Sequence, residues 1–220
     1  MSQEQDTRTA FMEATYRAIC EHGYADLTMQ DIADETDKSK AALHYHFDGK
    51  DDLFREFLAF LHEGFAETIT DHPAGTPVEQ LVALVRRVLD PVDDEADRQF
   101  NTALMEIKAQ APYRDGYREA LRRFDEDLHA EIAGLVAAAV DAGQYDADTE
   151  PEEIAEHVLT YIHGTWTRAA AIGADVVTMR EHLVEDLLDL VVDEAEVSVT
   201  AVDAADESSA DADAEEVTSR

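Results

Sequence analysis

The residues best suited to recognise another molecule lie together in residues 27–53, where hydroxyl, basic and aromatic side chains alternate with apolar ones. Thr28 and Ser39 are good helix N-caps, because a side-chain hydroxyl oxygen accepts a hydrogen bond from an unpaired N–H of the first turn. Asp31, three residues after Thr28, completes a pair of the capping-box type. These signals predict two short helices joined by a polar turn, the second over 40–46. This is the helix-turn-helix pattern, whose second helix enters the major groove of DNA.

The second helix carries the side chains that could read a base sequence. We expect Leu43 and Phe47 to turn inward, because positions four apart share one face of a helix. That arrangement leaves Lys40, His44 and Tyr45 on the outer side, where they could reach the edges of bases. Direct readout would then rest on few side chains.

Other residues of the motif are suited to phosphate contacts. Backbone N–H groups at the Ser39 helix start can hold a phosphate, and Thr28 and Lys50 are expected to hold phosphates and set the register. Ala42 offers only an apolar contact, for instance with a thymine methyl. The full predicted DNA-contacting set is Thr28, Lys38, Ser39, Lys40, Ala41, Ala42, His44, Tyr45 and Lys50.

The run SKAALHYHFDGKDDL, residues 39–53, resembles the signature of the TetR family of transcriptional regulators. The upstream phrase HGYADLTMQDIA extends the resemblance over roughly the first sixty residues. Ala41 stands where the family usually has Gly, and His44 where it usually has Tyr. Later in the chain, the segment IHGTWTRAAAIG resembles the effector domain of BetI-like regulators. The matching signature positions are Ser39, Lys40, Leu43, Tyr45, His46, Phe47, Lys50 and Leu53.

The resemblance implies an all-α fold of about nine helices and a particular function. A three-helix helix-turn-helix domain would precede a helical domain for effector binding and dimerisation. The protein would be a regulator, usually a repressor, of a palindromic operator in double-stranded DNA, released by a small-molecule effector. It would need no cofactor.

Apolar residues recur at helical spacing over most of the chain, and no strand alternation of consequence interrupts them. From residue 193 the sequence is Ala, Asp, Glu, Ser, Thr and Val with one final Arg, too polar to repay the entropy of ordering. We therefore expect three regions: 1–52 for DNA binding, 53–193 for ligand binding and dimerisation, and 194–220 as a disordered acidic tail. The expected helices are 7–22, the two of the motif, 50–72, 77–90, 94–111, 113–141, 151–172 and 176–193.

The charge balance is extreme, with 51 acidic and 17 basic residues and a net charge of −34. Such a charge opposes DNA binding, yet residues 38–50 hold three lysines against one aspartate. A uniformly acidic surface is similar to that of proteins working in molar intracellular salt, where the Debye length falls to about 3 Å and repulsion is screened. We expect a halophilic protein; an ordinary acidic protein is the alternative.

The chain gives no sign of a membrane or secretory destination. No stretch approaches the eighteen or so apolar residues of a membrane span, and the first residues lack a basic-then-apolar signal. One cysteine, Cys20, excludes a disulfide framework within the chain and is expected in the core. A cytoplasmic protein without membrane contact is predicted.

An effector pocket is implied by the resemblance and by aromatic residues on the helices that should enclose the C-terminal core. For each residue taken alone, ordinary core packing is the simpler interpretation. If a ligand binds, the long helix from Lys50 would carry the movement to the DNA-binding end. The pocket candidates are Phe65, Phe100, Leu104, Tyr117, Phe124, His163 and Trp166.

The last two expected helices are too apolar to be covered by one small domain. The resemblance implies that they meet their copy in a four-helix bundle, which gives a twofold homodimer. The two recognition helices would then lie about one DNA turn apart, roughly 34–36 Å. The interface candidates are Ile154, Val158, Ile162, Met179, Leu183, Leu187 and Leu190.

Other classes of function find less support. No GxSxG, HExxH or Walker-type motif is present, so an enzyme is not expected and no catalytic residue is proposed. His44 and His46 point to different sides of one helix, which argues against a shared metal ion. The row Arg114, Arg118 and Arg122 could attract an acidic effector, but pairing with neighbouring acids is the simpler prediction. A helical protein-interaction adaptor without DNA binding remains the alternative function.

Overall fold

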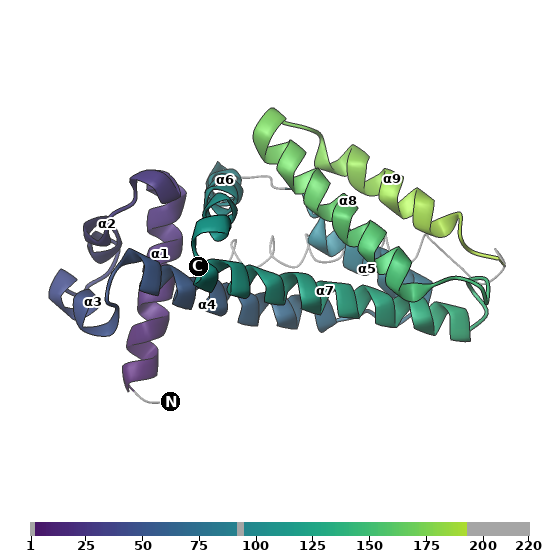
Figure 1. Cartoon of the computed structure of the whole chain (residues 1–220), viewed down its shortest axis with the longest axis horizontal. Coiled ribbons are helices and arrows are strands. Elements are labelled where there is room, and N and C mark those ends of the chain that lie inside the picture. Colours follow the sequence, from purple (N-terminus) through teal and green to yellow (C-terminus); the bar gives the residue numbers. More distant parts are fainter. Residues whose placement is uncertain (1–2, 92–94, 193–220) are drawn as a thin grey trace, which may run out of the picture.

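The computed structural model describes residues 3–91 and 95–192, and within them the chain is helical with no β-strand. Figure 1 shows an elongated molecule with the first three helices at one end. The all-α prediction is confirmed. The predicted tail, 194–220, lies outside the described residues. The helices are α1 (Gln3–Asp26), α2 (Met29–Asp34), α3 (Lys40–His46), α4 (Lys50–Thr70), α5 (Pro77–Val88), α6 (Glu95–Gln110), the 3-10 turn η1 (Ala111–Tyr113), α7 (Asp115–Asp141), α8 (Pro151–Ile172) and α9 (Val176–Leu188).

Most helix boundaries agree with the sequence signals, and two helices have the bounds predicted for them, α3 and α8. The last helix is shorter than predicted, ending at Leu188 instead of residue 193. Beyond it the backbone turns to another partner: Val191 forms an isolated bridge with Tyr145, and the Val192 N–H donates to the Gln144 carbonyl at 2.9 Å. These bonds replace those that a longer helix would have made.

Two hydrophobic clusters divide the core, and α4 contributes to both. Its first half places Leu53, Phe54, Phe57 and Leu58 in the N-terminal cluster with residues of α1 and α3. Its far end places Ile69 in the second cluster, which is built from α5, α7, α8 and α9. A 21-residue helix is long enough for this, since each residue adds about 1.5 Å. Movement at one end of α4 can therefore reach the other.

The N-terminal cluster is not closed by the first four helices alone. Ala103 and Ile107 of α6 and Tyr117 and Ala120 of α7 are buried in it. Figure 1 shows α6 beside α1, and α7 alongside α4. The N-terminal end is thus packed directly against helices that also build the C-terminal half.

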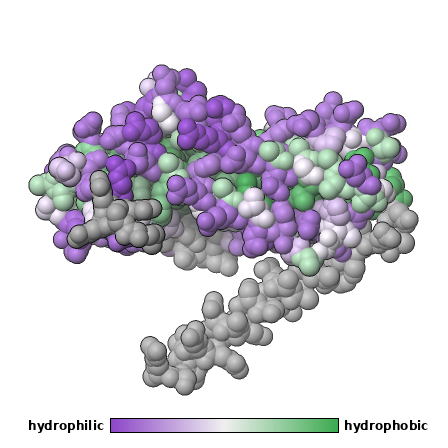
Figure 2. Space-filling model, turned by 90° about the horizontal axis from the view of Figure 1, so that it is seen from below, coloured by the Kyte–Doolittle hydropathy of each residue, from purple (hydrophilic) through white to green (hydrophobic). Residues whose placement is uncertain are grey.

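The outer surface is mostly hydrophilic. In Figure 2 the strongest hydrophobic colour lies over the C-terminal half, at the right of the view. In the described ranges, no helix has the length and apolar character that crossing a membrane would require.

Candidate nucleic-acid interface and ligand cavity

The helix-turn-helix begins with a complete capping box at Thr28. Its hydroxyl oxygen accepts from the N–H groups of Gln30 at 3.2 Å and Asp31 at 3.4 Å. The Asp31 carboxylate accepts in return from the Thr28 N–H at 2.7 Å and from its hydroxyl at 2.8 Å. These bonds lower the pKa of Asp31 below its ordinary value. Thr28 is exposed, but its hydroxyl is already committed to fixing α2.

The outward face of α3 carries the predicted recognition residues. Ser39 caps the helix by accepting from the Ala42 N–H at 3.1 Å, and Leu43 and Phe47 are buried beneath it. On the opposite side Lys40, Ala41, His44 and Tyr45 are exposed, and 85% of the Tyr45 side chain faces solvent. An unburied tyrosine of that size covers no core, so it is free to contact a partner.

Two other predicted contacts lie at the margin of this face. Lys38 pairs with Asp37 at 3.4 Å in the turn between α2 and α3. Ala42 is half-buried and packs against the N-terminal cluster, which leaves little of it for an apolar contact with a base.

The structure places Lys50 in a different role from the predicted phosphate contact. Its ammonium donates to the backbone carbonyls of Tyr24 and Leu27, the latter at 2.8 Å, and lies 4.3 Å from the centre of the Tyr24 ring. Burial is the main cause that lowers the pKa of Lys50. With two of its three donors used internally, Lys50 positions the loop between α1 and α2.

Glu106 of α6 holds the same loop from the other side. Its Oε2 accepts from the Tyr24 N–H at 2.8 Å and the Ala25 N–H at 3.1 Å. Gly23, with a left-handed φ of 69°, breaks the α1 helix at this point and leaves those two N–H groups without helical partners. Sequence reasoning missed Glu106, because its partners lie about eighty positions away along the chain.

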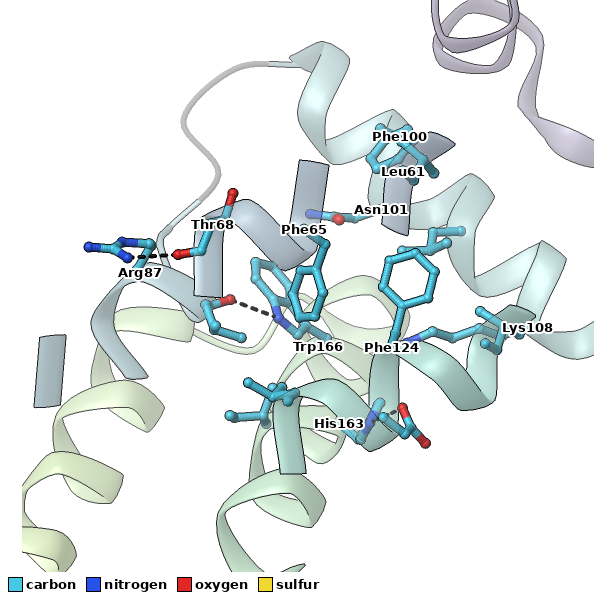
Figure 3. A pocket seen from close by; sticks show the side chains of 16 residues that line it. Leu61, Phe65, Thr68, Arg87, Phe100, Asn101, Lys108, Phe124, His163 and Trp166 are labelled. Carbon is cyan, nitrogen blue, oxygen red and sulfur yellow. Dashed lines mark hydrogen bonds and ion pairs between the residues drawn. The ribbon is translucent and has the colours of Figure 1, made fainter. Parts of the chain in front are cut away.

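A cavity of about 570 Å³ lies between α4, α5, α6, α7 and α8 (Figure 3). Six of the seven predicted pocket residues line it: Phe65, Phe100, Leu104, Phe124, His163 and Trp166. The prediction is wrong for Tyr117, which is buried in the N-terminal cluster with its hydroxyl 3.3 Å from that of Tyr24. Burial and this hydrogen bond raise the pKa of Tyr117. The rest of the lining is Leu61, Thr68, Arg87, Val88, Asn101, Lys108, Leu121, Asp125, Leu128 and Ile162.

Some polar groups of the lining are bonded to other parts of the chain. Trp166 Nε1 donates to the Val88 carbonyl at 3.2 Å, and Arg87 donates to the carbonyls of Thr68 at 2.7 Å and of Asp71. His163 Nε2 lies 3.0 Å from Asp125 Oδ1 but makes no hydrogen bond within the described residues. Lys108, which sequence reasoning missed, enters the lining from α6. A mostly apolar cavity of this size with a few polar groups is typical of a small-molecule site.

The arginine row of α7 is paired with acids, as predicted. Arg114 pairs with Asp51 of α4, Arg118 with Asp115 at 2.9 Å, and Arg122 with Glu119 at 2.9 Å. Arg122 also pairs with Glu126. None of the three lines the cavity.

Four of the predicted interface residues are core residues of the single chain. Val158, Ile162, Leu183 and Leu187 are buried among α5, α7, α8 and α9, so the interface prediction is wrong for them. The apolar stripe that these four residues form is covered within the protomer. Ile154 packs partly against that core, Met179 is half-buried and Leu190 is exposed.

The outer faces of α8 and α9 still carry exposed apolar side chains, chiefly Ile172 and Val177. Gly164 is also exposed on α8, and a Cβ added there would meet nothing within 4 Å. Figure 1 shows these two helices packed side by side on the outside of the C-terminal half. Across residues 3–91 and 95–192, no group of three or more metal-binding side chains occurs.

Comparisons with known proteins agree with this arrangement. Residues 11–57 match the family of bacterial regulatory proteins of the tetR type, and residues 77–193 match the C-terminal domain of BetI-type transcriptional repressors. A TetR transcription regulator from Haloarcula marismortui is 35% identical, with a TM-score of 0.77 over 85% of this chain and 98% of that one.

Two more distant relatives, one matched by sequence and one by structure, agree with this result. The regulator TtgR of Pseudomonas putida is 26% identical over 73% of this chain and 78% of its own length. A transcriptional regulator from Saccharomonospora viridis, solved in complex with choline, is 23% identical, with a TM-score of 0.70 over 84% of this chain and 96% of that one. These relatives are regulators and not enzymes, and this chain belongs with them to the TetR family of DNA-binding transcriptional regulators.

Proposed function

We propose that the protein is a repressor that binds a palindromic operator through the exposed face of α3. The observation that supports this is that α3 has one buried face and one exposed face. Leu43 is fully buried, whereas Lys40, His44 and Tyr45 face solvent. Ser39 and its first-turn N–H groups would hold a phosphate, and Lys38 adds a positive charge nearby. Residues 1–52 serve DNA binding in this proposal, and 53–193 serve ligand binding and dimerisation.

The operator-binding form is a homodimer in this proposal. The outer faces of α8 and α9, with Ile172, Val177 and Gly164, would pack against the same faces of a second copy. A twofold axis there would set two α3 helices about one DNA turn apart, roughly 34–36 Å.

A small molecule in the cavity would control DNA binding through the loop between α1 and α2. Two helices that line the cavity also hold this loop, α6 through Glu106 and α4 through Lys50. The loop leads directly into Thr28, the cap of α2. A ligand that displaced α6 or α4 would therefore shift the helix-turn-helix, provided that it bound one conformer better by a few kcal/mol.

The acidic surface is compatible with DNA binding in the cytoplasm of a salt-accumulating halophile. At about 1 M salt the screening length is about 3 Å, so the net charge of −34 would not repel DNA at long range. The 35% identity to a Haloarcula marismortui regulator supports this proposal.

A band shift with fragments of the source genome in molar KCl tests the repressor proposal. We expect retention of a few fragments that share a palindromic sequence. Lys40→Ala should weaken the shift, whereas Arg123→Ala, which removes an exposed charge on α7, should preserve it. Absence of any shifted fragment would favour the helical adaptor instead.

A further inference from the structure

The cavity lining contains one charged group, Lys108, to which the described residues give no hydrogen bond or ion pair. Lys108 lies in its lining, and burial lowers the pKa of this lysine. Within the described ranges its ammonium makes no hydrogen bond and no ion pair; Asp125 is the acidic group whose field reaches it. Lys108 is half-buried, and an ammonium partly removed from water without a partner is costly, so a counter-charge would stabilise it.

Asp125 is poorly placed to supply that counter-charge. Its Oδ1 lies 3.0 Å from His163 Nε2, which also lines the cavity, and about half of the Asp125 side chain faces solvent. In Figure 3 His163 lies below Phe124, and Lys108 lies to the right of Phe124. The acid thus lies beside a histidine and is partly open to water.

We propose that the cavity binds an apolar organic acid, with its carboxylate on the Lys108 ammonium and its hydrocarbon or aromatic body against Phe65, Phe124 and Trp166. This deepens the proposed ligand control and rests on it. The cavity of about 570 Å³ fits a single drug-sized molecule. A charge-assisted hydrogen bond to a carboxylate would satisfy a donor that water reaches poorly.

The charge of the ligand distinguishes an organic acid from two other classes of ligand, quaternary ammonium ions and neutral molecules. A quaternary ammonium would find aromatic faces to rest on, but it would place a second positive charge beside Lys108 in a water-poor space. A neutral ligand would displace water from the ammonium and offer no charge in return. Only an anion turns the buried cation into a favourable contact.

The fluorescence of Trp166 measures binding directly, because it is the only tryptophan in the sequence and it lines the cavity. The probes are three molecules of similar size: 4-phenylbutyrate, 4-phenylbutan-1-ol and (3-phenylpropyl)trimethylammonium. Each is titrated into the full-length protein, excited at a wavelength where the probes do not absorb. We expect the carboxylate to bind at least about tenfold more tightly than either of the others.

Lys108→Met is the variant that isolates the ion pair, since it keeps the length and apolar stem of the side chain. It should lose the tenfold preference for the carboxylate while binding the alcohol as well as the wild type or better. Arg123→Met, which removes an exposed cation of α7 outside the cavity, should keep the preference.

The results of these titrations test the acid-ligand proposal without testing the proposed DNA binding. Equal or tighter binding of the alcohol or the ammonium, or a preference that survives Lys108→Met, would overturn the acid assignment. A lack of response to all three probes would also overturn it. In each case the band shift without ligand reports independently whether the protein binds DNA.

Discussion

At the scale of single residues, the capping box of α2 gives the molecule a defined acid sensitivity. Thr28 lowers the pKa of Asp31 from 3.8, so the folded protein binds this proton less readily than the unfolded chain does. The carboxylate therefore contributes stability above about pH 4 that is lost as the pH falls through the lowered folded value. Asp31→Asn should make the free energy of unfolding less pH-dependent below about pH 4. Parallel wild-type and variant profiles in chemical denaturation would contradict this.

Lys108 should have the opposite effect on stability. Burial lowers its pKa, so the folded protein holds this proton less tightly than the unfolded chain and the ammonium opposes folding at neutral pH. Lys108→Met should raise the free energy of unfolding near pH 7 by on the order of 1 kcal/mol. The gain should shrink as the pH rises toward the ordinary lysine value of 10.5. Denaturant titrations at pH 7 and pH 10 measure both effects, and a destabilised variant at pH 7 would rule out an uncompensated charge.

At the scale of elements, α6 is expected to restrain the loop that leads into the helix-turn-helix. Glu106→Ala removes the acceptor of the Tyr24 and Ala25 N–H groups and should cost about 1–3 kcal/mol. Hydrogen exchange should quicken at residues 24–28 and stay unchanged at residues 155–165. Glu13→Ala, an exposed acid on α1, is the matched control. Unchanged exchange at 24–28 would show that α6 does not hold the loop.

Local sequence signals predicted some elements of the site correctly and others not. The bounds of α3 and the inward turn of Leu43 and Phe47 follow from caps and spacing within a few residues, and both are confirmed. The roles of Lys50 and Glu106 depend on partners about 25 and 80 positions away, which no local pattern reveals. The pocket prediction for Tyr117 and the interface prediction for the buried residues of α9 were wrong for a related reason. A hydrophobic stripe shows that a face is covered, but not by which neighbour.

At the scale of the whole molecule, substitutions at two glycines test whether the protein is a dimer through α8. Gly164 of α8 and Gly134 of α7 are both exposed and helical, and a Cβ at either would meet nothing within 4 Å in the single chain. Replacing either by Gln should therefore stabilise the isolated fold by roughly 0.5–1 kcal/mol. If α8 packs against a second copy, Gly164→Gln should shift sedimentation toward the monomer, whereas Gly134→Gln should not. A dimer that tolerates Gly164→Gln would place the interface elsewhere.

The most direct test is the affinity of the full-length protein for its own enriched genomic fragment, measured by fluorescence anisotropy in molar KCl for the wild type, Lys40→Ala and Tyr45→Ala. We expect each substitution on α3 to weaken binding by about 1–3 kcal/mol, with unchanged thermal stability because both side chains are exposed. Wild-type affinity in both variants would contradict the assignment of α3 as the DNA-reading helix.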